Sequence, residues 1–122
     1  MNPSSELHTD HRGGGPVRLL VAWEQPGLVS SAEAEVWANE QLVELAGDRA
    51  VTNMRVLRLA QPSTEHATSF AWLLEVCLPS RADAARLLSE PPLQAFLCDL
   101  RSLRLRRLTL LVHERSWALT DR

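Results

Sequence analysis

Five ionisable side chains in strand-like segments of this sequence have types that suit acid–base chemistry: Arg18, Glu24, Glu75, His113 and Arg115. The pKa of a histidine lies near neutrality, and a neighbouring carboxylate can orient its ring. An arginine beside them could stabilise an enolate oxygen. The set therefore indicates removal of a proton next to a carbonyl group, with His113 or Glu75 as the base and Arg115 or Arg18 as the stabilising cation.

The same residues have a plain structural alternative. The charges could pair with one another at a subunit interface or stand in solvent at strand ends, because spacing alone does not bring side chains together. Arg18, Glu24 and Trp37 are candidate ligand-binding residues. Trp37 could wall a pocket, but a large apolar residue at helical spacing is also typical of an ordinary core.

Motifs for other chemistries are absent from the sequence. It contains no Rossmann, P-loop, nucleophile-elbow or zincin pattern, and Gly13–Gly15 follows no strand. His8 and His11 lack further ligands, so no metal and no cofactor is expected. Cys77 and Cys98 form no CxxC pair, which favours two buried thiols in a reducing cytosol.

Length and charge bound the remaining possibilities. The 122 residues fit one domain, and the net charge of -2 provides no general attraction for nucleic acid or membrane. The sequence has no apolar run of about 18 residues and no signal-peptide pattern, so we expect a cytoplasmic protein.

The elements that must position these residues follow a β-α-β-β-α-β order. Residues 1–16 are polar and glycine-rich and predict a disordered tail before a domain at 17–120. Ser30 and Glu33 match a capping box at the start of the first helix. Expected strands are 17–24, 51–61, 67–78 and 104–117, and expected helices are 31–46 and a second one from 80, interrupted at Glu90-Pro91-Pro92.

Strand alternation divides the predicted antiparallel sheet into two faces. We expect the more apolar sets to face the helices, including Leu108, Leu110 and Val112 in the last strand. The mixed sets, with Arg18, Glu24, Glu75, His113 and Arg115, would then line the other face. Right-handed crossovers place both helices on one side, so a ligand, a nucleic acid or a second copy must cover the bare face.

Several segments resemble the dimeric α+β barrel superfamily, in its EthD-like and polyketide-cyclase-like branch. They are the turn Gln25-Pro26-Gly27, the helix with Trp37-Ala38-Asn39-Glu40, and the segment LLSEPPLQAFLCDLRSL with Asp99. The resemblance spans about residues 17–117. It implies a ferredoxin-like fold, a homodimer whose sheets close into a barrel, and a cleft between sheet and helices. Members include cofactor-free oxygenases of aromatic polyketides, aldol cyclases, dehydratases and haem-binding enzymes.

The sequence departs from this family at one informative position. Many members carry a histidine late in the first helix, where this chain has Glu40, Gln41 and Leu42. The usual acid–base residue is therefore missing, and haem ligation is disfavoured.

Two functions stay open on these grounds. One is a cofactor-free enzyme acting on an aromatic or polyketide-like small molecule, and the other is a non-catalytic dimeric ligand-binding or accessory protein. An enclosed cavity would favour the first, and a barrel filled by side chains the second. RNA binding is weaker, because SFAWLLE at 69–75 lacks the arginine and glycine that open the RNP1 pattern.

Overall fold

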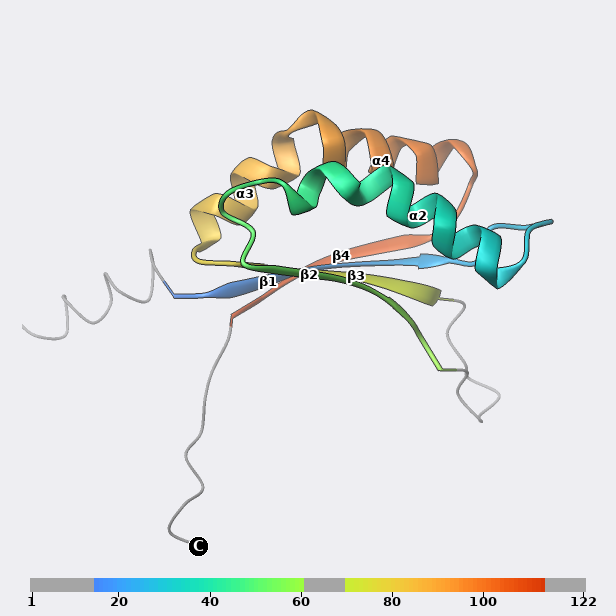
Figure 1. The fold of residues 1–122 in the computed structure, drawn as a ribbon, viewed down its shortest axis with the longest axis horizontal. Coiled ribbons are helices and arrows are strands. Elements are labelled where there is room, and N and C mark those ends of the chain that lie inside the picture. Colours follow the sequence, from blue (N-terminus) through green and yellow to red (C-terminus); the bar gives the residue numbers. More distant parts are fainter. Residues whose placement is uncertain (1–14, 61–69, 114–122) are drawn as a thin grey trace, which may run out of the picture.

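The computed structural model describes residues 15–60 and 70–113, which form a four-stranded sheet with three helices on one side (Figure 1). The sheet order is β2-β3-β1-β4, and every neighbouring pair is antiparallel. This confirms the predicted ferredoxin-like α+β fold. The elements are β1 Val17–Glu24, α2 Ser31–Ala46, β2 Asn53–Arg58, β3 Phe70–Leu78, α3 Arg81–Ser89, α4 Pro91–Ser102 and β4 Arg107–His113.

Two strands begin later than predicted, each for a local reason. The chain is still turning before β2, because the Val51 N–H donates to the Asp48 carbonyl. Before β4, Arg104 has a φ of 59° and the Leu105 N–H donates to the Leu100 carbonyl, which closes the end of α4. Residues 1–14, 61–69 and 114–122 lie outside the described residues, and with them most of the predicted tail 1–16 and the predicted turn 62–66.

Helix α2 begins where the capping box predicted. The Ser30 Oγ accepts the Glu33 N–H at 3.1 Å, and the Glu33 Oε1 accepts the Ser30 N–H at 2.9 Å. The hydrogen bond from the Ser30 backbone also lowers the pKa of the Glu33 carboxyl. The buried face of α2 then carries Ala34, Ala38, Leu42 and Leu45 at helical spacing.

The break between α3 and α4 also lies where the sequence predicted it. Pro91 and Pro92 occupy the first positions of α4, where a missing N–H costs nothing. Glu90, with extended φ and ψ, ends one helix and begins the next. The second crossover is therefore two short helices, and each can lie flat on the sheet.

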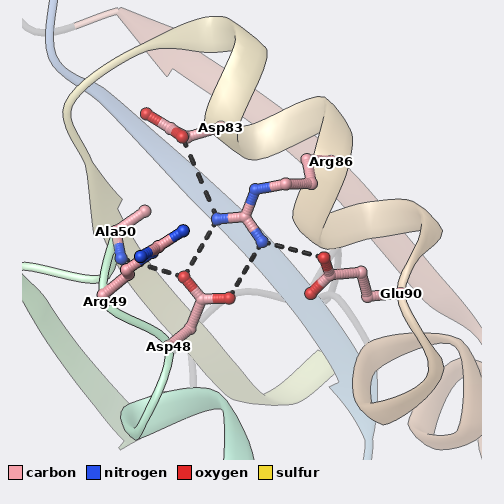
Figure 2. Close-up of a pocket in the computed structure, with 6 residues that line it drawn as sticks. All are labelled: Asp48, Arg49, Ala50, Asp83, Arg86 and Glu90. Carbon is pink, nitrogen blue, oxygen red and sulfur yellow. Dashed lines mark hydrogen bonds and ion pairs between the residues drawn. The ribbon is translucent and has the colours of Figure 1, made fainter.

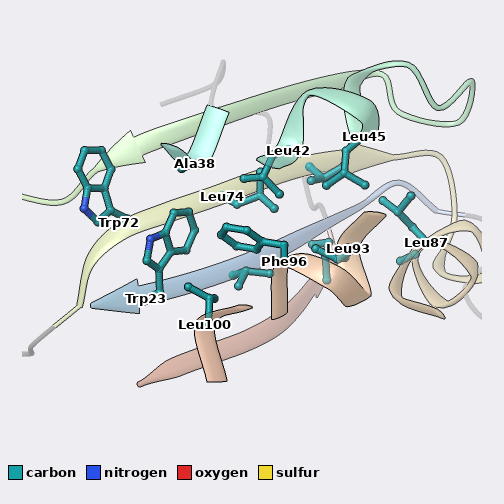
Figure 3. Close-up of a cluster of buried hydrophobic side chains, with 14 of the residues drawn as sticks. Trp23, Ala38, Leu42, Leu45, Trp72, Leu74, Leu87, Leu93, Phe96 and Leu100 are labelled. Atoms are coloured by element: carbon teal, nitrogen blue, oxygen red, sulfur yellow. The ribbon is translucent and has the colours of Figure 1, made fainter. Parts of the chain in front are cut away.

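The core fills the layer between helices and sheet (Figure 3). Alternate residues of β1 and β3 are buried, and both sets agree with the predicted alternation. Phe96 of α4 packs edge-on against Trp23 at a centroid distance of 5.0 Å, and its ring is tilted against that of Trp37 at 5.5 Å. Trp37, a candidate pocket wall, is therefore a partly buried neighbour of the core.

Gln25 links the loop before α2 to this core. Its Oε1 accepts the indole N–H of Trp72 at 2.8 Å, and its Nε2 donates to the Val29 carbonyl at 3.1 Å. The side-chain amide thus satisfies the polar atom of a buried tryptophan and holds the loop in place at the same time.

The predicted facing of β4 was wrong. His113 lies opposite Val17 in the register, and Leu111 lies opposite Leu19. Opposite residues of antiparallel strands share a face, so His113 and Leu111 are on the helix side and Leu108, Leu110 and Val112 are on the other side. These three side chains are 44%, 47% and 40% exposed. The register with β1 fixes this facing, and it leaves the more apolar set of an edge strand to be covered by something other than a helix.

We expect Phe96→Ala to lower the free energy of unfolding by about 3–5 kcal/mol, because it opens a cavity between the two tryptophans. Urea unfolding followed by circular dichroism measures the change. Ala95→Ser, on the exposed side of the same helix, should change it by less than about 0.5 kcal/mol. Equal effects of the two substitutions would contradict the position of Phe96 at the centre of the core.

Candidate functional site

The sheet face without helices, called here the open face, carries a buried carboxylate at its middle. Glu75 of β3 is 6% exposed. Its Oε2 accepts from the Arg18 Nη1 at 3.0 Å, and its Oε1 accepts from the Arg55 Nε at 2.8 Å. Arg55 lies directly opposite Glu75 in the register, whereas Arg18 reaches it from a diagonal position on β1.

Apolar side chains surround this ion cluster. The register places one set from each strand on the open face: Leu20 and Ala22 of β1, Leu57 of β2, Leu73 of β3, and Leu108, Leu110 and Val112 of β4. No helix of the described residues covers them (Figure 1). The open face is therefore an apolar surface with one paired charge cluster within it.

The predicted catalytic residues do not converge. His113 stands on the helix side at the end of β4, across the sheet from the face that carries Glu75. Glu24 lies at the far end of β1, where its Oε1 accepts the Arg106 N–H at 2.6 Å and its Oε2 is 3.7 Å from the Arg106 Nε. Arg115 lies outside the described residues. Among the predicted residues that lie within 15–60 and 70–113, Arg18 and Glu75 form an ion pair.

Arg55 completes the cluster and was not singled out in the sequence. The segment NMRVLR of β2 does contain the signal, because Arg55 stands between two apolar residues of the opposite face. With both arginines in place, each oxygen of Glu75 accepts from a guanidinium group. A general base needs an oxygen that can accept a substrate proton, whereas both oxygens of Glu75 already accept from arginines.

A second polar site lies between α3 and the turn after α2 (Figure 2). It is a cleft of about 320 Å³ on the helix side of the molecule. The lining residues are Asp48, Arg49, Ala50, Asp83, Arg86 and Glu90. Its size is that of a small ligand site, so the state of its charged groups decides what it can do.

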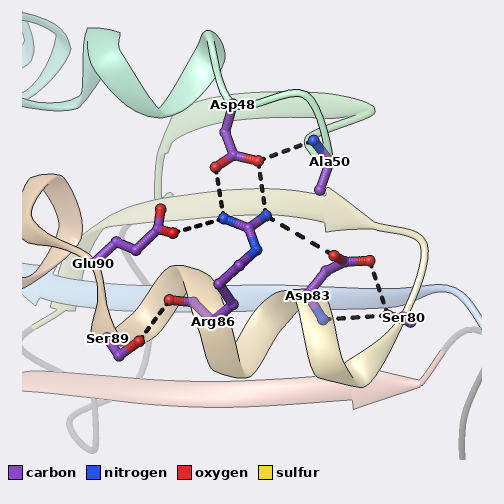
Figure 4. A network of polar contacts seen from close by, with 7 residues as sticks. All are labelled: Asp48, Ala50, Ser80, Asp83, Arg86, Ser89 and Glu90. Carbon is purple, nitrogen blue, oxygen red and sulfur yellow. Dashed lines mark hydrogen bonds and ion pairs between the residues drawn. The ribbon is translucent and has the colours of Figure 1, made fainter.

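Arg86 occupies the centre of this cleft (Figure 4). Its two terminal nitrogens donate to the two oxygens of Asp48 at 3.0 and 2.9 Å, and Nη1 also donates to Glu90 at 2.9 Å. Asp48 further accepts the Ala50 N–H at 2.9 Å. This bidentate pair joins α3 to the turn after α2, so we interpret the cleft as a structural clamp.

The clamp has a clear electrostatic signature. Hydrogen bonds from the Arg86 guanidinium, and then from the Ala50 N–H, lower the pKa of Asp48 to about 2. The same carboxylate, with Glu90, raises the pKa of Arg86. In the sequence only the helical spacings of Arg86 with Asp83 and with Glu90 signal a contact, because Asp48 is 38 positions away.

Other features bear on ligands. No three His, Cys, Asp or Glu side chains within 15–60 and 70–113 are grouped to hold a metal ion. Cys77 is partly buried on the open face, but Cys98 is exposed on α4, so the prediction of two buried thiols was wrong for Cys98. None of the helices described has the length and apolar character needed to cross a membrane.

Comparisons with known proteins locate the similarity at the level of fold. No family model matches the sequence, and no curated protein is significantly similar to it. A DABB family protein with a ferredoxin-like fold from Mesorhizobium loti superposes with a TM-score of 0.64 at 19% identity, covering 84% of this chain and 99% of that one. An EthD family protein from Bacillus halodurans gives 0.62 at 18% identity, covering 82% and 99%.

An enzyme of known activity has the same fold. SnoaB, a cofactor-independent oxygenase from Streptomyces nogalater, superposes with a TM-score of 0.64 at 16% identity, covering 88% of this chain and 99% of that one. Other matching structures are described as dimeric ferredoxin-like proteins of unknown function. Identities this low establish a common fold and leave the activity to be argued from the side chains.

The Asp48–Arg86 clamp predicts an acid-sensitive contribution to stability. The pKa of Asp48 is lowered from 3.8 to about 2 on folding, so the contribution is complete above 3.8 and is lost as the pH falls through about 2. The free energy of unfolding of Asp48→Asn should therefore fall less steeply than that of the wild type across this range.

Denaturant unfolding at a series of pH values and one protein concentration measures this difference. Ser89→Ala, a substitution beside the clamp that changes no charge, should keep the steep acid dependence of the wild type. Parallel pH profiles for the wild type and Asp48→Asn would contradict the clamp.

Proposed function

We propose that this chain, which has the ferredoxin-like fold of the dimeric α+β barrel superfamily, is a homodimeric ligand-binding or accessory protein. In this proposal it does not perform the acid–base chemistry indicated by His113 and Glu75. The observation that carries the proposal is the state of Glu75, whose two oxygens accept from Arg18 and Arg55 on the face opposite to His113.

The layer between sheet and helices supports the same conclusion. The family resemblance implies a cleft there, yet Trp23, Trp72 and Phe96 are each at most 2% exposed within it (Figure 3). We infer that these three side chains leave no space for a ligand between them. A small aromatic or polyketide-like ligand, if one binds, would have to use space that dimerisation encloses. We also propose that the protein is located in the reducing cytoplasm, where its two cysteines stay as thiols.

A second copy of the chain is the proposed cover for the open face. The exposed side chains of Leu108, Leu110 and Val112 form an apolar strip along β4. Two copies can cover this strip by an isologous contact, in which the same surface serves both subunits. Matching structures described as dimeric support this arrangement.

The Arg18–Glu75–Arg55 cluster suits a position inside such a barrel. An unpaired charge taken out of water costs several kcal/mol, and partners that donate hydrogen bonds offset much of that cost. Glu75 already has such partners within one chain. We therefore assign the cluster a structural role, which is to place a polar group in the interface without leaving it unsatisfied.

Leu110→Glu tests the dimer. A carboxylate in the middle of the apolar strip should convert the dimer into a monomer of 13.6 kDa, because the charge would lose its water in the interface. Light scattering at about 5 μM protein in about 1 M salt measures the mass with surface charges screened. Thr109→Glu, an exposed neighbour on the other face of β4, is the matched control and should stay dimeric.

Two results would overturn this part of the proposal. One is a monomeric wild type under these conditions. The other is a Leu110→Glu variant that remains dimeric. Because Leu110 is 47% exposed in the single chain, its substitution should leave the fold intact, and circular dichroism verifies this.

A cofactor-free enzyme is the second candidate, favoured by the fold shared with the SnoaB oxygenase. Its test is oxygen uptake with a 1,8-dihydroxyanthrone probe, an aromatic compound of the polyketide type. Our first proposal predicts no uptake above the rate without protein. Uptake by the wild type that Glu75→Gln abolishes and Glu44→Gln keeps would overturn it and establish Glu75 as a catalytic residue.

A further inference from the structure

A second exposed apolar surface lies on the layer opposite the open face. Along the outer side of α2, Val36 and Val43 are 55% and 63% exposed, and Asn39 stands between them. Residues at this spacing, alternately three and four apart, form one straight stripe of a helix. The loop before α2 adds two more exposed apolar side chains, Val29 and the fully exposed Leu28. We call the stripe together with this loop the α2 ridge.

Within helix α2, the charged residues beside the stripe are all acidic. Helix α2 carries Glu33, Glu35, Glu40 and Glu44 and no basic residue. Among the ion pairs of the described residues, none involves Glu35, Glu40 or Glu44. Glu40 and Glu44 are four positions apart and repel each other, and Glu44 lies unfavourably at the negative end of the helix dipole. The carboxylates of the ridge could therefore pair with cations of a partner molecule.

The turn between α4 and β4 has the complementary composition. Leu103 is half exposed there, with Arg101, Arg104 and Arg106 around it. This basic turn adjoins the start of the α2 ridge, because the Glu24 N–H donates to the Arg106 carbonyl just before the loop begins. The turn after α4 and the loop before α2 lie at the same end of the molecule (Figure 1). This end thus joins an apolar and basic turn to an apolar and acidic helix.

Backbone strain marks the same two places. Leu28 and Arg104, with φ of 67° and 59°, are the non-glycine residues with positive φ in the described chain. A leucine or arginine in this region costs of order 1 kcal/mol more than glycine. Both side chains are exposed, so packing in the core does not account for them. The positive φ of Arg104 belongs to the closure of α4, so Leu28 is the residue whose strain marks an exposed turn that a partner could contact.

We propose that the α2 ridge docks on the α2 ridge of a second copy, with the two helices antiparallel. Helix α2 is about 24 Å long, so reversal places the basic turn of each copy near Glu40 and Glu44 of the other. The valines of the two stripes meet in between. A two-fold contact requires a self-complementary surface, and this surface provides both charges and the apolar ridge.

The contact leaves the open face free, so it links barrel dimers and goes beyond the function proposed above. A single helix pair buries less than the roughly 1,200–2,000 Å² of a stable interface. The association is therefore weak, rises with protein concentration and falls with salt, because the charges involved are exposed.

Sedimentation velocity of the full chain tests the contact at low salt over a series of protein concentrations. The weight-average mass of the wild type should rise above that of the dimer at high concentration and return to it in about 1 M salt. Val36→Gln with Val43→Gln should abolish the rise. Ala82→Gln with Ala85→Gln, on the exposed side of α3, should preserve it.

Charge reversal identifies the partner surfaces. Glu40→Arg with Glu44→Arg, and separately Arg101→Glu with Arg104→Glu, should each lose the rise, and mixing the two variants should restore it. A wild-type mass that stays constant with concentration overturns the proposal, as does a rise that the valine substitutions leave unchanged. A weight-average mass equal to that of the monomer in high salt would instead contradict the barrel dimer. The ridge contact would still be detected as a mass at low salt that rises above the monomer mass with concentration.

Discussion

The structure depends on the fact that helices cover only one face of the sheet. Helices α2, α3 and α4 fill that side with leucines and aromatic rings, and the other side keeps an apolar surface of its own. Burial of apolar area is the main favourable term in folding, so covering the exposed apolar surface would lower the free energy further. The position of Leu110 on the open face and the paired state of Glu75 are both intelligible as adaptations to this one-sided cover.

Side chains whose types suit catalysis form hydrogen-bonded ion pairs in this molecule. Glu75 and Arg18 have the types of a base and an oxyanion partner, yet the geometry adds Arg55 and occupies both carboxylate oxygens. Asp48 and Arg86 likewise form a bidentate pair that joins a turn to a helix. In both places we distinguish a structural ion pair from a reactive one by the number of hydrogen-bond donors to the carboxylate. Residue types alone do not reveal that number.

Local signals in the sequence predicted the elements well. The Ser30 capping box and the proline pair after Glu90 act through neighbouring backbone atoms, so their effects can be read from a few residues. Alternation in β4 divided its residues into the correct two sets. It did not show which set lies on the helix side of the sheet, because that depends on the register with β1. The pairing of Arg55 with Glu75 and of Asp48 with Arg86 joins distant segments, which no local pattern specifies. The site was therefore predicted less well than the fold.

Gln25 gives the molecule an internal optical reporter. Its amide connects the carbonyl of Val29, in the strained loop, to the indole N–H of the buried Trp72. Indole emission responds to the polarity and hydrogen bonding of its ring nitrogen. Any event that displaces this loop, including occupation of the surface beside it, would change the surroundings of a tryptophan in the core. The native chain thus carries a fluorescent probe that requires no label.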